Sequence, residues 1–470
     1  MDEHIFRQYD IRGKVGTQLM YDQVYNLTCA IAAYIIKYHS LAKTVVVGMD
    51  GRVHSPEIAQ QVSSALCDSG FNVVMLGVCP TPVFYFALHT LSVDAGIMVT
   101  ASHNGAEYNG MKINIRTDSV WGEGIQEIKR MYQQGVKRIS NTQGMCVLYP
   151  LNDTYISFLV DHFPQLHGCE YRMIFDCGNG AAGVIMPQLI EAMQWKNASL
   201  LYEQVDGTFP HHEADPTIAE NMADLRTAVL ENNSDVGIGF DGDADRMIPI
   251  THRGVMMPGD HVLALYAQEI IAQTAGAGVV FDGKCSLIVS QLVSQAGGVP
   301  RQVPSGHAII KDAMKRYKAL CAGELSGHFF FADSYFGFDD GIYAALRLIC
   351  IMHSQGKSLE LLRQSLPVTY STPEIRLTCP DNKKFNVIES IQHNVTQYAT
   401  QNSDVELQLF DGVRMVTPEG WALIRASHTQ DVVSVRLEAF TQTGLVHMKN
   451  KLLPLLGTHF DEAVLQIYFM

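Results

Sequence analysis

Residues 45–76 read VVVGMDGRVHSPEIAQQVSSALCDSGFNVVML, and this stretch decides the fold. Val45–Val47 predicts a strand, and Ser55 followed by Pro56 predicts an N-cap and the first position of a helix. Val73–Leu76 predicts the next strand. One face of the intervening helix is apolar and consists of Ile58, Ala59, Val62, Ala65 and Leu66. A strand, a helix and a strand in this order predict a crossover connection and a largely parallel sheet.

The same pattern recurs twice along the chain. The second set of predicted strands is Met173–Phe175, Ser199–Leu201 and Val236–Phe240. The third set is Val279–Phe281, Leu287–Val293 and Ala319–Cys321. After about Leu366, strand-like segments and helices are segregated, which predicts a separate α+β domain.

We therefore expect an α/β protein with three related mixed α/β domains and a C-terminal α+β domain. A length of 470 residues alone favours about three domains of ~150 residues each, and the pattern adds a fourth. The expected boundaries give domains at 1–150, 151–252, 253–365 and 366–470.

The composition excludes several classes of function. Hydrophobic residues make up 47% and charged residues 17%, which is typical of a folded protein. The net charge of −14 argues against nucleic acid and against an anionic membrane surface as partners. We find no run of about 18 apolar residues and no signal-peptide pattern, so we expect a cytoplasmic protein. The ten cysteines are scattered without a C-x-x-C pair and are expected to be reduced.

Three polar loops follow predicted strands. They are Thr100–Gly105 (TASHNG), Asp241–Arg246 (DGDADR) and Gly323–His328 (GELSGH). In α/β sheets ligands bind beyond the carboxyl ends of parallel strands. Three domains that each contribute one such loop could converge on a single cleft.

The aspartate loop carries the sharpest signal. Asp241, Asp243 and Asp245 alternate with small residues, so their carboxylates can turn toward one point. Like charges ~4 Å apart repel by about 4 kcal/mol at an effective dielectric of 20, and a divalent cation relieves this repulsion. Ligands that are all oxygen favour Mg²⁺. A solvated acidic turn and an aspartyl-phosphate loop with Asp241 as nucleophile are the alternatives. Arg246 and His252 stand where an EF-hand needs glycine and glutamate.

The other two loops are weaker when taken alone. Ser102 next to His103 suggests a nucleophile with its base, although a serine in a capped polar turn explains the same residues. Glu324 and Ser326 stand between glycines and could hydrogen-bond neighbouring sugar hydroxyls.

A fourth motif, GNGAAG at 178–183, matches the dinucleotide-binding fingerprint. It follows a predicted strand, and Glu203 lies where a ribose ligand would be expected. This match supplies an alternative hypothesis, an NAD-dependent oxidoreductase. A tight strand-to-helix turn is the simpler interpretation, because the motif falls in mid-chain and explains neither the serine loop nor the aspartate loop.

Together, the motifs resemble the α-D-phosphohexomutases, and most closely the bacterial phosphomannomutase/phosphoglucomutase group. The resemblance runs nearly end to end and rests on FRQYDIRG (6–13), TASHN (100–104), YNGMKI (108–113), GNGAAG, DGDADR, Gly306-His307, GELSGH and RASHT (425–429). It implies a four-domain isomerase with a central cleft. Such an enzyme moves a phosphoryl group between O6 and O1 of a hexose phosphate, mannose and also glucose, through a hexose 1,6-bisphosphate that also serves as activator.

The resemblance also implies roles for individual residues. Ser102 would carry the phosphate, and Asp241, Asp243, Asp245 and a phosphoryl oxygen on Ser102 would bind Mg²⁺. The groups expected to brace the transferring oxygens are Arg12, Lys112 and Arg246. The candidates for proton transfer are His103, Lys112 and His328, among which the sequence does not decide. The expected substrate contacts are Tyr9, Lys284, His307, Glu324, Ser326, Arg425, Ser427 and Thr429.

Two departures from the family pattern concern fine geometry. Gly105-Ala106 follows TASHN where the family often has proline, and His428 stands where it commonly has asparagine. The sequence leaves open the preference between mannose and glucose, the pathway, the oligomeric state (a monomer is one option) and whether the serine is phosphorylated. A non-catalytic sensor of sugar phosphates is a third hypothesis.

Overall fold

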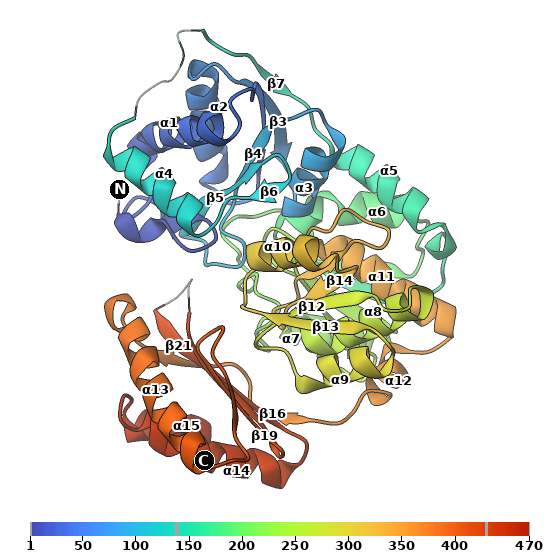
Figure 1. Cartoon of the computed structure of the whole chain (residues 1–470). Helices are drawn as coiled ribbons and strands as arrows, with labels where there is room; N and C mark the ends of the chain where they lie inside the picture. Colours follow the sequence, from blue (N-terminus) through green and yellow to red (C-terminus); the bar gives the residue numbers. More distant parts are fainter. Residues whose placement is uncertain (1, 137–139, 141, 428–430, 470) are drawn as a thin grey trace.

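The computed structural model describes residues 2–136, 140, 142–427 and 431–469. Four sheets follow one another along the chain, and each is covered by helices (Figure 1). The first three form the upper part of the molecule in this view, and the orange-to-red C-terminal part lies below them. We number the corresponding domains 1 to 4; the boundaries at 150, 252 and 365 stay a prediction.

Domain 1 contains a seven-stranded sheet in the order β1-β5-β4-β2-β3-β7, with β6 paired to β5. Its strands are β1 (Ile11–Lys14), β2 (Thr44–Met49), β3 (Asn72–Val78), β4 (Ala95–Val99), β5 (Tyr108–Ile115), β6 (Asp118–Ser119) and β7 (Cys146–Leu148). Its helices are α1 (Tyr21–Tyr38), α2 (Ser55–Asp68), α3 (Thr81–Thr90) and α4 (Glu123–Gln133). The predicted strand-helix-strand unit over residues 45–76 is confirmed as β2, α2 and β3, with β2 and β3 parallel.

Domains 2 and 3 each contain a four-stranded sheet. Domain 2 consists of α5 (Asn152–His162), β8 (Met173–Asp176), α6 (Met186–Ala192), β9 (Ala198–Leu201), α7 (Ala223–Glu231), β10 (Val236–Phe240) and β11 (Met247–Thr251). Domain 3 begins with α8 (Gly259–Gln273), β12 (Gly278–Asp282), α9 (Leu287–Gln295) and β13 (Val299–Val303). It continues with α10 (His307–Tyr317), β14 (Cys321–Gly323), β15 (Phe329–Phe331), α11 (Gly341–Gln355) and α12 (Leu359–Gln364).

The sheets of domains 1, 2 and 3 share one strand order. The orders β5-β4-β2-β3, β11-β10-β8-β9 and β15-β14-β12-β13 correspond strand by strand. In each of these orders the last three strands are parallel to one another, and the first two form an antiparallel pair. Each polar loop connects the two strands of this antiparallel pair, so the three loops are equivalent hairpin connections of one repeated fold.

Domain 4 has a different, antiparallel sheet in the order β16-β21-β20-β19-β18, with β17 also paired to β21. Its strands are β16 (Tyr370–Ser371), β17 (Ile375–Thr378), β18 (Glu406–Gln408), β19 (Val413–Thr417), β20 (Gly420–Ala426) and β21 (Val432–Ala439). Its helices are α13 (Asp381–Gln401), α14 (Gln442–Leu456) and α15 (Glu462–Phe469). The predicted segregation of strands and helices after Leu366 is confirmed.

One predicted strand is wrong. Leu287–Val293 lies within helix α9, and the next strand along the chain is β13, which pairs with β12. The Ser286 side chain accepts a hydrogen bond from the backbone N–H of Ile288 and so caps this helix. A short apolar run cannot be assigned to a strand or a buried helix by its pattern alone, and here the cap decides.

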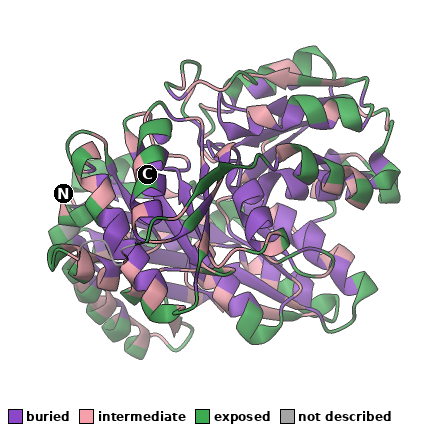
Figure 2. Cartoon of the chain, turned by 90° about the horizontal axis from the view of Figure 1, so that it is seen from above, coloured by how far each residue is buried: buried purple, intermediate pink, exposed green. Residues whose placement is uncertain are grey.

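Apolar packing joins domains 1 to 3 with one another, in addition to a separate core inside domain 1. One continuous apolar core joins Phe84 of α3 in domain 1 with Tyr155 of α5 in domain 2 and Tyr266 of α8 in domain 3. Domain 4 has a separate core around Ile391, Ile424 and Leu437. Figure 2 shows buried residues in the sheets and on the inner faces of the helices, with exposed residues on the outer helix faces. Domains 1 to 3 are therefore fixed together by packing.

Two expectations concern features of the whole chain. All ten cysteines are free, as predicted. Among the described residues, we find no helix with the length and apolar character needed to cross a lipid bilayer.

Candidate active site

The three polar loops come together at one place between domains 1, 2 and 3. The Ser102 hydroxyl donates to Asp241 Oδ2 across 2.9 Å, which joins the first loop to the second. Arg246 at the end of the second loop pairs through its backbone with His328 at the end of the third. The predicted convergence of the loops is therefore present.

The three aspartates of the second loop form a buried cluster. Asp241, Asp243 and Asp245 are each 0% exposed, and one carboxylate oxygen from each lies within 4.8 Å of the other two. Domain 1 supplies their partners: Thr81 donates to Asp243 Oδ2 at 2.6 Å, and Lys112 donates to Asp243 Oδ2 at 2.8 Å and Asp245 Oδ2 at 2.5 Å.

Two carboxylate oxygens of the cluster receive no hydrogen bond from these donors, and they are suited to bind a divalent cation. Asp243 Oδ1 and Asp245 Oδ1 are buried and have no hydrogen-bond partner among the described residues. Burying an unpaired carboxylate oxygen is costly, whereas a hard cation with oxygen ligands satisfies it. The three aspartates therefore form a set that could bind a metal ion.

The charged groups of the cluster shift one another's pKa. Burial, together with the neighbouring Asp245 and Asp243, raises the pKa of Asp241 well above its ordinary value. Burial alone would lower the pKa of Lys112, but Asp243 and Asp245 hold that pKa well above its usual range. Lys112 is therefore a fixed positive charge.

Ser102 sits at the tip of its hairpin in a constrained backbone. Its φ is +53°, which is uncommon for a residue other than glycine. The Arg52 guanidinium donates to the carbonyl oxygens of Ser102, Asn104 and Gly105 at 2.7, 2.6 and 2.7 Å. Arg52 is buried and was not among the predicted site residues. Its hydrogen bonds fix the backbone of the serine loop.

Two other predicted residues lie beside Ser102. His103 Nδ1 is 3.2 Å from Ser102 Oγ, and burial together with the charges of Arg246 and Arg12 lowers the pKa of His103 well below its ordinary value. Arg12 is buried, donates to Asn104 Oδ1 at 2.6 Å and pairs with Asp10. Arg246 donates through Nε to His328 Nε2 at 2.9 Å. All six predicted catalytic residues thus belong to the cluster of loops or its immediate partners.

The GNGAAG turn supports the aspartate loop. Ala181 N donates to Gly242 O at 2.9 Å, and a Cβ on Gly180 would lie 2.8 Å from the same oxygen. A Cβ on Gly183 would lie 2.0 Å from the carbonyl oxygen of Glu203. These glycines allow close packing of backbone on backbone, so the chain itself fills the space that a pyrophosphate would need.

A second group of predicted residues lies between domain 3, domain 4 and the start of domain 1. Glu324 Oε1 accepts from Gly306 N at 2.7 Å, and the Tyr9 hydroxyl donates to Ser305 O at 2.5 Å. His307 lies beside Tyr9, with ring centroids 6.2 Å apart. Leu325 is half-buried against the apolar core, whereas Ser326 is half-buried on the loop surface. Burial raises the pKa of Glu324.

Two cations among the predicted substrate contacts are each paired with a carboxylate of domain 4. Arg425 Nε donates to Asp411 Oδ1 at 2.9 Å, and Lys284 Nζ is 3.7 Å from Glu374 Oε1. Asp411 also accepts from Ser305 N at 3.0 Å, which links domain 4 to domain 3. Ser427 is buried at the end of β20. Thr429 and His428 lie outside the described residues.

Sequence reasoning missed the counter-charges and supports of the site: Thr81, Asp411, Glu374 and Arg52. Asp411 stands in an Asp-Gly turn signal, which predicts a loop but no partner. Thr81 opens α3, and its distance of 162 residues from Asp243 hides the pairing. Only the fold brings such residues together.

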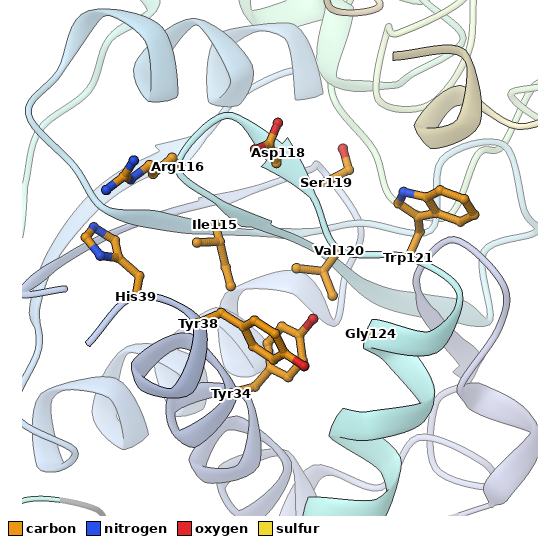
Figure 3. A pocket seen from close by; sticks show the side chains of 10 residues that line it. All are labelled: Tyr34, Tyr38, His39, Ile115, Arg116, Asp118, Ser119, Val120, Trp121 and Gly124. Carbon is orange, nitrogen blue, oxygen red and sulfur yellow. The ribbon is translucent and has the colours of Figure 1, made fainter. Parts of the chain in front are cut away.

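A separate cavity of about 410 Å³ lies in domain 1 (Figure 3). Tyr34 and Tyr38 of α1 form one side, Ile115 and Val120 lie opposite, and Trp121 closes one end. None of the predicted site residues lines it. This cavity is therefore separate from the converging loops.

Comparison with known proteins agrees with the geometry. Four domain families match the chain in order: phosphoglucomutase/phosphomannomutase α/β/α domain I over residues 3–138, domain II over 153–254, domain III over 258–370, and the C-terminal domain over 374–452.

Relatives match over nearly the whole chain. A phosphomannomutase/phosphoglucomutase from Pseudomonas syringae pv. tomato is 40% identical over 95% of this chain and 93% of its own length. A phosphoglucomutase from Neisseria gonorrhoeae is 35% identical, with 95% of both chains covered. The crystal structure of a phosphoglucomutase/phosphomannomutase family protein from Burkholderia thailandensis has a TM-score of 0.88 at 32% identity and covers 97% of this chain and 98% of that one. The chain therefore belongs to the phosphoglucomutase/phosphomannomutase family of α-D-phosphohexomutases.

Proposed function

We propose that this protein is a phosphohexomutase that interconverts hexose 6-phosphates and hexose 1-phosphates by way of a phosphoryl group on Ser102. The observation that carries the proposal is the 2.9 Å contact of Ser102 Oγ with one of three clustered, buried aspartates. Relatives are named for mannose and for glucose, so we propose both hexose phosphates as substrates.

We propose Mg²⁺ as the metal, held by Asp241, Asp243, Asp245 and an oxygen of the phosphorylated serine. The donors are all oxygen, and two carboxylate oxygens lack a partner among the described residues. When bound, Mg²⁺ would withdraw charge from the phosphoryl group. Lys112 donates hydrogen bonds to Oδ2 of Asp243 and of Asp245 and so holds these two carboxylates in place.

In the transfer step a sugar hydroxyl attacks the phosphorus, the bond from phosphorus to Ser102 Oγ breaks, and the hydroxyl proton passes to a base. The products are a hexose 1,6-bisphosphate and free Ser102. After the bisphosphate turns end for end, its other phosphate returns to Ser102. Positioning and charge stabilisation dominate such reactions, and Arg12, Lys112 and Arg246 supply the positive charge.

We propose different roles for the three candidates for proton transfer, based on their contacts. Lys112 lies between two carboxylates that keep it charged, so we assign it to charge stabilisation. His103 contacts Ser102 Oγ and would exchange the proton of the serine oxygen. His328 lies beside Arg246 and within 4.0 Å of Glu324, so we assign it the proton of the sugar hydroxyl.

The remote phosphate would be held by the second group of residues. We propose that Glu324 and Ser326 bind sugar hydroxyls, and that Arg425, Ser427 and Thr429 bind the non-transferring phosphate with Tyr9, Lys284 and His307. In this structure Arg425 and Lys284 face Asp411 and Glu374, so the bound phosphate competes with these carboxylates.

Two other hypotheses are less well supported. An NAD-dependent oxidoreductase would need room at Gly178–Gly183, where Gly180 packs on Gly242 and Gly183 on Glu203. A non-catalytic sensor would bind sugar phosphates in the same cleft without converting them.

A coupled assay distinguishes these functions. With Mg²⁺ and a trace of glucose 1,6-bisphosphate, we expect turnover of mannose 1-phosphate and glucose 1-phosphate, and none by a Ser102→Ala variant. Binding of both sugars without turnover would support the sensor. Binding of NAD(H) measured by calorimetry, without mutase activity, would support the oxidoreductase.

A further inference from the structure

We propose that Arg376 of domain 4 binds one phosphate of the 1,6-bisphosphate intermediate and retains this intermediate while it turns; the inference rests on the proposed function. Arg376 lies in β17 and belongs to none of the motifs discussed above. Its side chain is 38% exposed, so a ligand can reach its guanidinium. Three features of the structure support this role: the register of the sheet, the pairing of the charges, and the proximity of the serine loop.

The register of the domain 4 sheet places Arg376 beside the proposed phosphate clamp. Arg376 lies opposite Ser434 of β21, and Ser434 lies opposite Arg425 of β20. Residues directly opposite one another in antiparallel strands project from the same face of a sheet. The two arginines therefore share one face and are two strand spacings apart, ~10 Å at the backbone. Ile375 and Leu377, the neighbours of Arg376 in β17, pack into the domain 4 core on the other face.

The charge of Arg376 is only partly balanced. Arg376 Nη2 lies 3.7 Å from Glu374 Oε2, which is an ion pair without a hydrogen bond. Lys284 Nζ lies at the same distance, 3.7 Å, from the other carboxylate oxygen of Glu374. A single carboxylate thus faces two cations and cannot neutralise both. A phosphate dianion, which accepts several hydrogen bonds, is suited to the guanidinium donors that Glu374 leaves without a hydrogen bond.

The charge of Arg376 also acts on the serine loop of domain 1. Burial lowers the pKa of His103, the neighbour of Ser102, and positive charges lower this pKa further. These charges include Arg246, Arg12 and, from domain 4, Arg376. An electrostatic effect of this kind weakens with distance. Arg376 therefore lies near the end of the site where Ser102 would carry the phosphate.

This arrangement suits a ligand with a phosphate at each end. One phosphate of a hexose 1,6-bisphosphate faces Ser102 and the other faces Arg425, and the two exchange places when the ligand turns. Once the bond to Ser102 Oγ has broken, no covalent bond holds the ligand. Arg376 then binds the phosphate on the serine side, because a guanidinium stays charged and contacts phosphate through two parallel hydrogen bonds. Since both arginines belong to one sheet, the same pair serves either orientation of the ligand.

Removal of the guanidinium should increase the loss of the intermediate. We expect Arg376→Ala to release about tenfold more bisphosphate per turnover, because weaker contacts act mainly on the dissociation rate. The variant should accordingly need about tenfold more added glucose 1,6-bisphosphate for half-maximal activity. At saturating bisphosphate, KM for glucose 1-phosphate should stay within about threefold of the parent value. Arg376→Lys, which keeps a charge without the planar fork, should recover part of the loss.

The matched control is Arg172→Ala, which removes an arginine with the same kind of contact from domain 2. Arg172 Nη2 lies 3.7 Å from Asp235 Oδ1, and its side chain is 54% exposed. The change in net charge and the loss of one exposed ion pair are therefore the same as in Arg376→Ala. We expect the release of bisphosphate and the bisphosphate requirement of this control to equal those of the parent enzyme.

A rapid-quench experiment measures the release directly. The Mg²⁺ enzyme, phosphorylated on Ser102, is mixed with radiolabelled glucose 6-phosphate and chased with unlabelled glucose 1,6-bisphosphate. We expect the ratio of label in free bisphosphate to label in glucose 1-phosphate to rise about tenfold in Arg376→Ala.

An unchanged ratio in Arg376→Ala, or the same rise in Arg172→Ala, would overturn the role of Arg376. A parent enzyme that forms no phosphoserine and no labelled bisphosphate would instead overturn the proposed function. If Arg376→Ala does not fold, Arg376→Gln in the same experiment decides.

Discussion

The proposed chemical centre and the proposed phosphate clamp differ in how the fold holds them. Ser102, the three aspartates and Lys112 are buried between domains that share one apolar core, and each makes several contacts. Arg425 belongs to domain 4, which has its own core, and Lys284 belongs to domain 3; each faces one carboxylate of domain 4. Packing thus preassembles the reacting groups, whereas the clamp depends on polar contacts that a ligand can replace.

The largest expected effect follows from removing a charge in the rigid centre. Asp243→Asn should lower kcat by about 10³-fold, because this buried side chain combines contacts to Thr81 and Lys112 with a proposed metal ligand. Steady-state assays over a Mg²⁺ series measure the loss. Asp153→Asn, an exposed change in α5, is the matched control. A loss below tenfold at saturating Mg²⁺ would remove Asp243 from the centre.

A mutation in the clamp should act on binding and leave the chemistry nearly intact. Arg425→Ala should raise KM for hexose phosphate by about 30-fold, equivalent to about 2 kcal/mol, with kcat within about fivefold. Arg172→Ala, an exposed arginine of domain 2, serves as control. Equal losses in kcat and kcat/KM would show that domain 4 takes part in the chemical step.

A mutation in the GNGAAG turn tests whether the reaction requires a rigidly held aspartate loop. Gly180→Ala places a Cβ 2.8 Å from Gly242 O, so the aspartate loop must shift. We expect the free energy of unfolding to fall by about 1–3 kcal/mol and kcat to fall about tenfold. Calorimetry measures the first change and enzyme kinetics the second. Gly457→Ala, whose nearest neighbour atom would be 3.4 Å away, should change neither. An unaltered kcat would mean that the centre tolerates displacement.

The ion pair between Lys284 and Glu374 should contribute a smaller, pH-dependent term. Burial alone would raise the pKa of Glu374, but Lys284 and the Ser434 hydroxyl lower it from 4.5 to about 2. A carboxyl group with a lowered pKa stabilises the fold above its unfolded pKa, and this contribution disappears as the pH falls from about 4.5 toward 2. Glu374→Gln should therefore cost about 1–2 kcal/mol at pH 7 and progressively less below pH 4.5.

Differential scanning calorimetry of parent and variant at pH 7, 5 and 3.5 measures this difference. A difference in Tm that stays constant over this range would mean that Glu374 is not held ionised by Lys284.

The difference between local sequence patterns and contacts across the assembled fold explains which features the sequence could predict. The strands, the three polar loops and the aspartate cluster depend on local patterns, so they were predictable residue by residue. Leu287–Val293 was assigned wrongly because an apolar run of that length fits two structures. Asp339, Asp411 and Thr81 were missed because each is defined by a partner in another domain or loop. Their pairing with His328, Arg425 and Asp243 depends on the assembled fold.

The proposed covalent phosphate on Ser102 is the feature on which both parts of the proposed site depend. The most direct test incubates the Mg²⁺ enzyme with glucose 1,6-bisphosphate, maps the modified peptide by mass spectrometry, and then adds glucose 6-phosphate. The proposed function predicts one phosphate per chain, located on Ser102 and transferred to the sugar as a 1,6-bisphosphate within one turnover. Full turnover by an enzyme whose Ser102 never carries phosphate would contradict it.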